Sequence, residues 1–366
     1  MNRRNWLITS SVAVSGLSLL PLKDLALPAS AKPDEWLPEG ARITLSFNEN
    51  PYGPSQAAKT AMAASVHLGN RYQWDMIHEL MKRIAAKNKV DADNVWVGAG
   101  STEILDLLAQ RAELRKGSVV IAKPSFDRWA VTARACGMKS IEVPLTQSRH
   151  HDLDAMLKAI RPDTRMVYIC NPNNPTGTIC RRSDLVSFIE KASKKTMVVV
   201  DEAYLDFTEE SSLTELAVKN DNLVVVKTFS KIYGLAGARA GYAVASQKTI
   251  EELNNLRSGA DMSISAVTMA GAIASLADDA FVTSARTLNE AARKFTIDQL
   301  EKLNIACIQS HTNFIYFSLA NYKNDFFKLL KDNNISGTGI FEEDGKWSRI
   351  TVGTMREMQR FIEVLK

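Results

Sequence analysis

The segment 227–239, with the sequence KTFSKIYGLAGAR, places cationic and hydroxyl side chains directly after the apolar run NLVVV. Lys231 is a candidate for covalent chemistry, because a lysine amine that loses its proton attacks carbonyl carbons. Arg239, with the hydroxyls of Thr228 and Ser230, is a candidate anion site, since guanidinium and hydroxyl groups bind phosphate. A solvated turn would contain the same residue types, so this interpretation depends on partners elsewhere in the chain.

Segment 98–103 offers a second group of anion ligands. Its sequence GAGSTE follows the apolar run VWV and opens a helical pattern, with Gly98 and Gly100 beside the hydroxyls of Ser101 and Thr102. Backbone N–H groups and hydroxyls at a helix N-terminus bind phosphate. A dinucleotide fingerprint would have a third glycine where this chain has glutamate, and a single phosphate therefore fits better.

Three further segments contribute a carboxylate, an amide and aromatic rings. Asp201 ends the apolar run VVVD, with Tyr204 three residues later, and a carboxylate in that position needs a cationic or hydrogen-bonding partner. Asn174 lies in CNPNNPTGT, where turn formation explains the prolines and the glycine but does not require this amide. Phe126 in KPSFDRW could cover a planar ring or belong to the core.

Each of these segments follows a short apolar run that is typical of a buried strand. The runs NVWVGA, GSVVIA, KSIEV, RMVYIC, TMVVVD, NLVVVK and RAGYAV alternate with helical patterns. This alternation predicts an α/β fold, in which helices cover both faces of a mostly parallel sheet and the motifs lie at the carboxyl ends of the strands. We expect a large domain over 61–245, preceded by an N-terminal arm over 32–60. The later helices and strands predict a smaller α+β domain over 246–366.

The motifs together resemble a known family. NENPYGP, NRY, NPNNPTG, VDEAY, FSKIYGLAGAR and RITVGT occur in this order over nearly the whole chain after position 31. They resemble the fold type I pyridoxal-phosphate-dependent aminotransferases of class I/II, and most of all the histidinol-phosphate aminotransferase family. The resemblance implies pyridoxal 5'-phosphate as cofactor, a seven-stranded sheet as in aspartate aminotransferase, and transamination as the activity.

The resemblance also implies a role for each candidate residue around the cofactor. Lys231 matches the catalytic lysine, which bonds to the cofactor aldehyde and later moves a proton at the substrate. Asp201 matches the carboxylate that keeps the ring nitrogen protonated. Tyr204 and Asn174 match donors to the ring oxygen. The residues that match ligands of the phosphate are Ser101, Thr102, Thr228, Ser230 and Arg239, and Phe126 matches the residue stacked on the ring.

Four other matched residues concern the substrate and a second subunit. Arg349 in SRITVGT matches the arginine that clamps the α-carboxylate of an amino-acid substrate, a role for which a bidentate guanidinium is suited. Asn50 and Tyr52 of the N-terminal arm match the substrate side of the site. Tyr72 in NRYQ matches a tyrosine that reaches the phosphate from the other subunit. The resemblance therefore implies a homodimer with shared active sites.

The segment before Arg349 departs from the histidinol-phosphate family. Members of that family carry a second arginine there for the substrate phosphate, whereas this chain has Glu342, Glu343 and Asp344 in GIFEEDGKW. Because three carboxylates would repel a phosphate, we expect an amino acid or amine as substrate rather than histidinol phosphate, with a 2-oxo acid or aldehyde as acceptor. A decarboxylase or lyase of the same fold that tailors a secreted metabolite is the alternative, since it would share every cofactor motif.

The first 31 residues predict a targeting signal. Arg3 and Arg4 precede Trp6 and an apolar run, and ASA at 29–31 is a small-x-small cleavage site. The arginine pair resembles a twin-arginine signal, and a general secretion signal with an accidental arginine pair is the alternative. We expect recognition by the export machinery, cleavage after Ala31 and a periplasmic or secreted enzyme with no stable membrane span.

The composition is that of a globular protein. The 366 residues are 45% hydrophobic and 23% charged, enough for two domains with a large core. A net charge of +4 gives no concentrated basic face, and we expect no nucleic-acid partner. Cys136, Cys170, Cys180 and Cys307 are too few for a disulfide framework, although Cys170 and Cys180 flank one turn. Five scattered histidines without an H-E-x-x-H motif predict no metal site.

Overall fold

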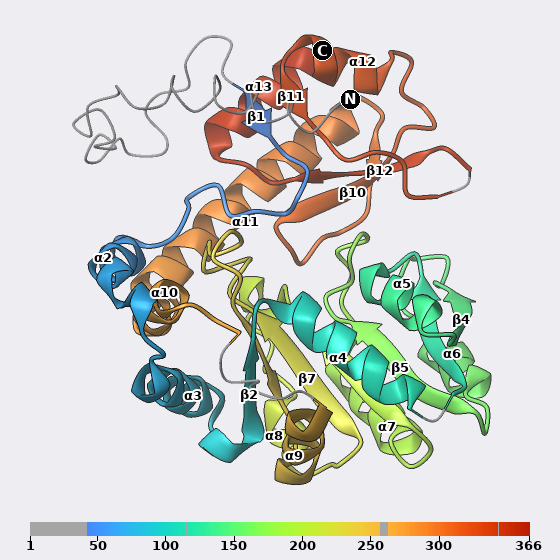
Figure 1. Ribbon diagram of the computed structural model, residues 1–366. Helices are drawn as coiled ribbons and strands as arrows, with labels where there is room; N and C mark the ends of the chain where they lie inside the picture. The colour runs from blue at the N-terminus through green and yellow to red at the C-terminus, as the bar shows by residue number, and fades with distance from the viewer. Residues whose placement is uncertain (1–41, 115, 257–262, 343) are drawn as a thin grey trace, which may run out of the picture. The chain divides into compact units, whose positions relative to one another are not determined.

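The computed structural model describes residues 42–114, 116–256, 263–342 and 344–366, all within one compact unit (Figure 1). The predicted signal, residues 1–31, and the first part of the predicted arm lie outside the described residues. The predicted limits of the arm and of the two domains stay predictions.

A seven-stranded sheet forms the centre, with the strand order β2-β8-β7-β6-β5-β3-β4. Strand β8 is antiparallel to its neighbours β2 and β7, and the other pairs are parallel. The predicted α/β fold with a mostly parallel sheet is confirmed. The strands are β2 (Val95–Gly98), β3 (Ser118–Lys123), β4 (Lys139–Pro144), β5 (Thr164–Cys170), β6 (Met197–Asp201), β7 (Leu223–Thr228) and β8 (Gly241–Val244).

Alternate residues of the strands face two different layers of helices. In β3, Val119 and Ile121 pack with one layer, whereas Val120 and Ala122 pack with the other. Because both faces are covered, these strands are apolar at almost every position instead of alternating with polar residues. The first layer contains α4 (Ser101–Glu113), α5 (Arg128–Ala135) and α9 (Gln247–Leu256), and the second contains α6 (Leu153–Ala159), α7 (Arg182–Ala192) and α8 (Thr214–Ala217).

A third apolar cluster lies at the β2 edge of the sheet. Leu80 of α3 and Met269 of α10 belong to it together with Val95 and Val97 of β2. The segments outside the sheet layers are α2 (Gln56–Ala64), α3 (Trp74–Asn88), α10 (Ala266–Leu276) and α11 (Asp279–Lys302), with the 3-10 turns η2 (Val66–Asn70), η3 (Ala92–Asn94) and η4 (Leu205–Phe207).

The N-terminal arm is bound to the C-terminal part of the chain by strand pairing and hydrogen bonds. Strand β1 (Ile43–Thr44) pairs in parallel with β11 (Ile335–Ser336). The Asn48 N–H donates to Thr351 Oγ1 at 2.9 Å, and Asn313 Nδ2 donates to the Asn48 carbonyl oxygen at 3.0 Å. The same part contains an antiparallel sheet in the order β12-β10-β9, made of β9 (Ala306–Cys307), β10 (Phe314–Ser318) and β12 (Trp347–Thr351), with α12 (Phe326–Asp332) and α13 (Met355–Leu365).

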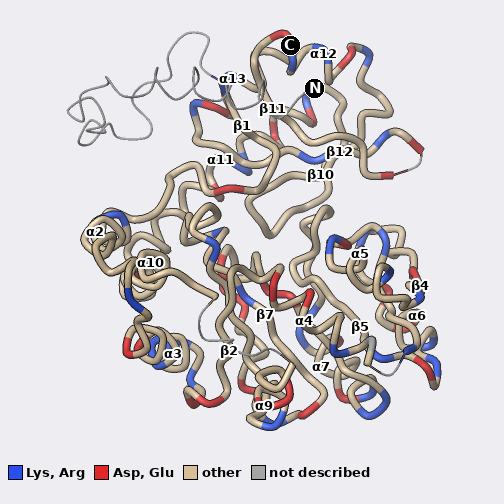
Figure 2. The backbone as a smooth tube through the Cα atoms, viewed as in Figure 1, with Lys and Arg blue, Asp and Glu red and all other residues tan. Residues whose placement is uncertain are grey.

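Acidic and basic residues lie side by side on the outer helices and loops (Figure 2). Within the described part of the chain, no single helix is both long and apolar enough to cross a membrane. Helices α10 and α11 meet that test only as a pair, across a bend of 79°.

Candidate active site

A cavity of about 580 Å³ lies at the carboxyl ends of the parallel strands. Cys170, Asp201 and Thr228, the last residues of β5, β6 and β7, line it. Such an edge is the usual ligand site of a parallel sheet. The predicted site residues that line the cavity are Ser101, Thr102, Phe126, Asn174, Asp201, Tyr204, Thr228, Ser230, Lys231, Arg239 and Arg349.

Lys231 lies in the loop after β7 and is half-buried in the cavity wall. Its Nζ donates to the Phe47 carbonyl oxygen at 2.9 Å and lies 5.7 Å from the centroid of the Tyr204 ring. Burial, followed by repulsion from the charge of Arg349, lowers the pKa of Lys231 from 10.5 to about 8. A substantial fraction of the amine is therefore neutral near pH 8, and only the neutral amine is a nucleophile or a base.

Asp201 is a buried carboxylate at the end of β6. Tyr168 Oη donates to its Oδ2 at 2.8 Å, and the Ala203 N–H donates to its Oδ1 at 3.0 Å. Burial raises the pKa of Asp201 from 3.8 to about 6. Across the described residues no lysine or arginine is within ion-pair distance of Asp201. The site thus holds a buried negative charge that lacks a directly contacting cation.

Tyr168 is a site residue that the sequence analysis missed. It lies in the middle of β5, where its register partner in β6 is Val199, and it is fully buried with its ring centroid 4.9 Å from that of Trp129. A tyrosine inside an otherwise apolar run is the one available signal, because its hydroxyl needs a buried partner. That partner is Asp201 on the neighbouring strand.

Arg349 and Tyr204 belong to a second polar cluster that lines the cavity. Asn48 Nδ2 donates to Tyr204 Oη at 3.0 Å, and Asn174 Nδ2 donates to the same oxygen at 3.4 Å. The Arg349 guanidinium donates to Asn174 Oδ1 and, at 2.9 Å, to the Ser46 carbonyl oxygen. Its Nε is buried and has no hydrogen-bond partner within the described ranges. Asn48 is therefore another contributor that the sequence analysis did not name.

The phosphate ligands predicted from sequence are assembled around the start of α4. Gly100 has φ = 85°, and a Cβ atom there would collide with the Arg239 guanidinium. A Cβ atom at Gly241 would collide with the backbone nitrogen of Ser101. The Arg239 guanidinium also reaches Ser230 Oγ at 3.5 Å. Gly100 thus allows the Arg239 guanidinium to lie beside the N-terminus of α4, and Gly241 allows β8 to approach the same helix start. This is an anion-binding arrangement.

Three predicted residues do not line the cavity. Asn50 Nδ2 donates to the Ile232 carbonyl oxygen at 2.8 Å, so it ties the arm to the loop that carries Lys231. Tyr52 donates its backbone N–H to Asn50 Oδ1 at 3.1 Å. Tyr72 lies between η2 and α3 and is 76% exposed. The predicted roles of these residues stay predictions.

The acidic run before Arg349 does not present three free charges to the cavity. Glu342 forms an ion pair with Arg149 at 2.6 Å and accepts a hydrogen bond from Tyr316 Oη at 2.6 Å. Asp344 Oδ1 accepts the backbone N–H of Lys346 at 3.0 Å. The remaining glutamate of the run lies outside the described residues. The charge of Glu342 is therefore balanced by the guanidinium of Arg149, which lies in the loop after β4.

Comparison with known proteins gives the class of this chain. Residues 42–365 match the family model for aminotransferase class I and II. The chain belongs to this family, and it is a transaminase that depends on pyridoxal phosphate.

Particular relatives share one name. A histidinol-phosphate aminotransferase from Moorella thermoacetica is 36% identical over 330 residues, which are 88% of this chain and 84% of the relative. Histidinol-phosphate aminotransferase 1 from Psychrobacter arcticus is 33% identical and aligns over 98% of both chains. The structure of the Sinorhizobium meliloti histidinol-phosphate aminotransferase in complex with pyridoxal-5'-phosphate shares the fold. Its TM-score is 0.79 at 24% identity, with 93% of this chain and 98% of that chain covered.

These findings correct the substrate and the location expected from the sequence. The expectation of a substrate other than histidinol phosphate is wrong, because relatives at 33% to 36% identity carry the name of that activity. The repulsion on which it rested fails at Glu342, whose charge Arg149 balances. The prediction of an exported, periplasmic or secreted enzyme is also wrong. Relatives that cover 88% to 98% of this chain are named histidinol-phosphate aminotransferase, which is the name of a biosynthetic activity and not of an exported enzyme.

The cavity residues fit pyridoxal phosphate on grounds of their own chemistry. The buried charge of Asp201 suits a protonated ring nitrogen, and the lowered pKa of Lys231 suits bonding to an aldehyde. The glycine-lined contact of Arg239 with the start of α4 suits a phosphate. Each part of the cofactor thus has a counterpart of complementary charge or reactivity.

Replacing Gly100 with alanine tests this cradle. The added methyl group must displace the Arg239 guanidinium, and alanine is strained at φ = 85°. We expect the Kd of the apoprotein for pyridoxal phosphate, measured by absorbance titration, to rise by about tenfold or more. Gly237→Ala is the matched control, because nothing lies within 4 Å of the position that its methyl group would occupy. Equal affinities of both variants would show that the cradle does not bind the phosphate.

Proposed function

We propose that this protein is a homodimeric aminotransferase that transfers the amino group of histidinol phosphate to a 2-oxo acid. The observation that carries the proposal is the convergence of Lys231, Asp201 and Arg349 on one cavity. The name shared by relatives at 33% to 36% identity supports the choice of substrate.

The chemistry is divided among a few side chains. Bound pyridoxal phosphate supplies a conjugated ring that accepts the electron pair released at the substrate carbon. Lys231 would hold the cofactor through Nζ until the substrate amino group replaces it, and the freed amine would take the proton from the substrate carbon that bears the amino group. Asp201 keeps a proton on the ring nitrogen through its own negative charge. Tyr168 orients that carboxylate by its hydrogen bond of 2.8 Å.

Other cavity residues bind rather than react. Arg239 and the hydroxyl groups around it would hold the cofactor phosphate, and Phe126, which lines the same cavity, would cover the ring. Tyr204 and Asn174 orient the ring oxygen, with Asn48 fixing the Tyr204 hydroxyl. The ligands of the phosphate in this proposal are Ser101, Thr102, Thr228, Ser230 and Arg239.

Arg349 binds the anionic end of both substrates in this proposal. Its buried guanidinium donates hydrogen bonds to Asn174 Oδ1 and to the Ser46 carbonyl oxygen. Its Nε has no hydrogen-bond partner among the described residues. A carboxylate of the amino-acid partner or the phosphate of histidinol phosphate would satisfy it through paired hydrogen bonds. Tyr72, exposed and away from its own cavity, supplies the contact expected from a second subunit.

The substrate is tested with the holoenzyme and 2-oxoglutarate. We expect formation of glutamate from histidinol phosphate with a kcat/KM about 100-fold above that for histidinol, because the uncharged alcohol leaves Arg349 without its anion. Ornithine and lysine serve as cationic comparison substrates. The proposal fails if histidinol or ornithine is used as well as the phosphate ester, or if ornithine or lysine releases carbon dioxide while histidinol phosphate gives no glutamate.

Replacing Arg349 with lysine tests the clamp. Lysine keeps the positive charge but cannot form paired planar hydrogen bonds, and it leaves Asn174 Oδ1 unpaired. We expect KM for both histidinol phosphate and glutamate to rise by about 10-fold to 100-fold, measured by initial rates. Arg293→Lys is the control, since that arginine is bonded to the Thr312 carbonyl oxygen outside the cavity. A change in kcat alone would contradict the assigned role.

A further inference from the structure

Two aromatic rings lie beside the guanidinium of Arg349, which binds the anionic end of the substrate in the proposed function. The Arg349 Cζ atom is 5.2 Å from the centroid of the Phe314 ring and 5.1 Å from that of the Phe341 ring. Phe341 lines the active-site cavity together with Arg349, and its backbone N–H donates to the Trp347 carbonyl oxygen at 2.9 Å. The position of the Phe341 ring therefore limits where the guanidinium can lie.

Tyr316 connects this aromatic contact to a charged pair. It is buried in β10, directly opposite Arg349 in the register of β10 with β12. Its ring meets that of Phe341 edge to face, with 6.1 Å between the centroids. Its hydroxyl donates to Glu342 Oε1 at 2.6 Å. Tyr316 thus contacts Phe341 through its ring and Glu342 through its hydroxyl.

Arg149 contacts the other oxygen of the same carboxylate. Its Nη1 lies 2.6 Å from Glu342 Oε2, and its guanidinium carbon lies 4.4 Å from the centroid of the Trp347 ring, which in turn stacks on Tyr316 at 5.1 Å. The side chains of Arg149 and Glu342 are only 22% and 18% exposed, so water screens this pair less than it screens a surface pair. Loss of one partner would leave the other charge uncompensated in a partly buried position.

The backbone of Arg149 is fixed by the loop that binds Arg349. Arg149 has φ = 65°, which is uncommon for a residue other than glycine and needs support from neighbouring contacts. Its carbonyl oxygen accepts the Thr178 hydroxyl at 2.8 Å. Thr178 follows Asn174 in the loop after β5, and Asn174 Oδ1 accepts the hydrogen bond from Arg349. The contacts therefore form a closed ring that begins and ends at Arg349.

We propose that Arg149 and Glu342 are positioning residues for substrate binding, which keep the Phe341 ring against Arg349. The inference rests on the proposed role of Arg349 as the anion clamp. Neither residue of the pair is among those that line the active-site cavity, and each acts through the aromatic residues between it and Arg349. Without the pair, the guanidinium keeps its charge but loses the support behind one of its two rings. We therefore expect weaker binding of anionic substrates and unchanged proton transfer at Lys231.

Replacing Glu342 with glutamine tests the pair. Glutamine still accepts the Tyr316 hydroxyl but no longer balances Arg149. Single-turnover absorbance measurements on the holoenzyme, with glutamate and separately with histidinol phosphate, give the half-saturating concentration and the limiting rate. We expect the half-saturating concentration to rise by about tenfold for both substrates, with the limiting rate within about threefold of the parent. The Kd for pyridoxal phosphate should stay within about twofold, since the Arg239 cradle lies outside the network.

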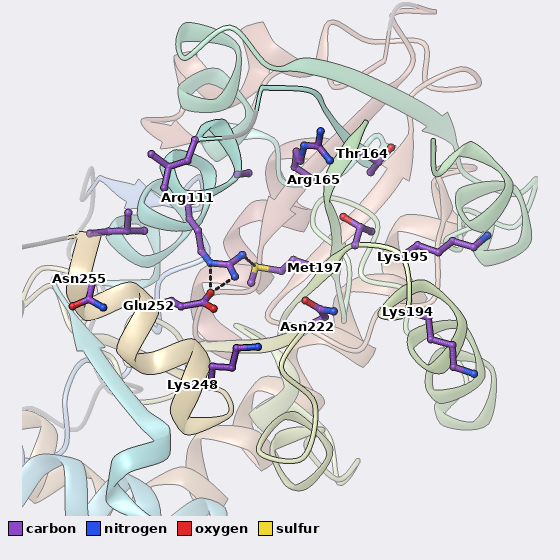
Figure 3. Close-up of a pocket in the computed structure, with 14 residues that line it drawn as sticks. Arg111, Thr164, Arg165, Lys194, Lys195, Met197, Asn222, Lys248, Glu252 and Asn255 are labelled. Carbon is purple, nitrogen blue, oxygen red and sulfur yellow. Dashed lines mark hydrogen bonds and ion pairs between the residues drawn. The ribbon is translucent and has the colours of Figure 1, made fainter. Parts of the chain in front are cut away.

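A matched ion pair lies away from the active site (Figure 3). Arg111 and Glu252 join α4 to α9, with side chains that are 23% and 39% exposed. They line a cavity beside Thr164 and Met197, the first residues of β5 and β6, whereas the active-site cavity lies at the other ends of these strands. Glu252→Gln removes the same charge from a partly buried pair and should leave the half-saturating concentrations within about twofold of the parent.

A double variant tests whether the pair acts as one unit. Arg149→Met removes the guanidinium from Glu342 and keeps an unbranched side chain beside Trp347. If the pair is the unit, Arg149→Met/Glu342→Gln should bind glutamate within about twofold of the weaker single variant. Arg149→Lys keeps the charge and should bind glutamate more tightly than Arg149→Met.

The inference is overturned if Glu342→Gln leaves both half-saturating concentrations unchanged, or if it lowers only the limiting rate. It is also overturned if Glu252→Gln has the same effect, or if the losses of the single variants multiply in the double variant. The substrate is judged separately. If the unmodified enzyme reacts with glutamate but not with histidinol phosphate, the proposed substrate fails, and the glutamate data alone decide the role of the pair.

Discussion

Replacing Lys231 with alanine is expected to lower the kcat of transamination by about four orders of magnitude or more. The variant loses both the amine that holds the cofactor and the base that moves the substrate proton. No other lysine lines the cavity among the described residues, so no neighbouring amine can take over. Single-turnover rates with histidinol phosphate and with glutamate measure the loss.

Lys231→Arg separates charge from basicity. Arginine keeps the positive charge but stays protonated, so we expect a loss nearly as large as that of the alanine variant. Lys191→Ala, on the exposed face of α7, controls for loss of a lysine. In the unmodified apoprotein, the rate of pyridoxal phosphate uptake should rise with pH around a midpoint near 8, where the Lys231 amine loses its proton. Retained turnover in Lys231→Ala would refute its covalent role.

Replacing Asp201 with asparagine is expected to change activity and apoprotein stability in opposite directions. Without the carboxylate the ring nitrogen loses its counter-charge, and we expect kcat to fall by about 100-fold to 1,000-fold. Asparagine occupies nearly the same volume and can bond to both Tyr168 and Ala203, since the Tyr168 hydroxyl either donates or accepts. A change in activity would therefore follow from charge and not from altered packing.

The stability effect follows from the sign of the pKa shift. The pKa of Asp201 is raised from 3.8 to about 6 in the folded protein, so the folded state binds the proton more tightly. Stability of the apoprotein therefore falls as pH rises from about 4 to about 6, by about 3 kcal/mol for a shift of two units, and the full penalty persists above pH 6. Asp201→Asn lacks this penalty.

Urea unfolding of both apoproteins at pH 8 and at pH 4 measures this difference. We expect Asp201→Asn to be the more stable of the two at pH 8, with the gap closing at pH 4, where Asp201 is protonated. Adding pyridoxal phosphate should reverse the order at pH 8, because the protonated ring nitrogen pairs with the wild-type carboxylate. A variant that is less stable than the parent at pH 8 without cofactor would contradict the burial argument.

The sequence was sufficient to predict the sheet and most of the cavity. Strands covered on both faces are apolar at almost every position, and parallel strands bring their carboxyl ends to one edge, so Asp201 and Thr228 could be placed together. Tyr168 could not be assigned in this way. Its contact with Asp201 depends on the strand order and register, which a single sequence does not contain.

The substrate prediction failed for a related reason. A run of acidic residues before Arg349 suggested repulsion of a phosphate, but net charge at a site depends on contacts from distant segments. Arg149, which balances Glu342, is 193 positions away in the chain. A count of the charges within the segment before Arg349 could not include Arg149.

The hydrogen bonds between the N-terminal arm and the C-terminal part of the chain have a consequence for the synthesis of this protein. Asn48, which lines the cavity beside Phe47, is translated 303 positions before Thr351, the residue to which its backbone N–H donates. A nascent chain that has not reached Thr351 lacks the bond that secures the arm over Lys231. The contact of Phe47 with Lys231 is therefore secured only after β12 has been translated, and a chain released before that point lacks the bond that holds the arm beside its reactive lysine.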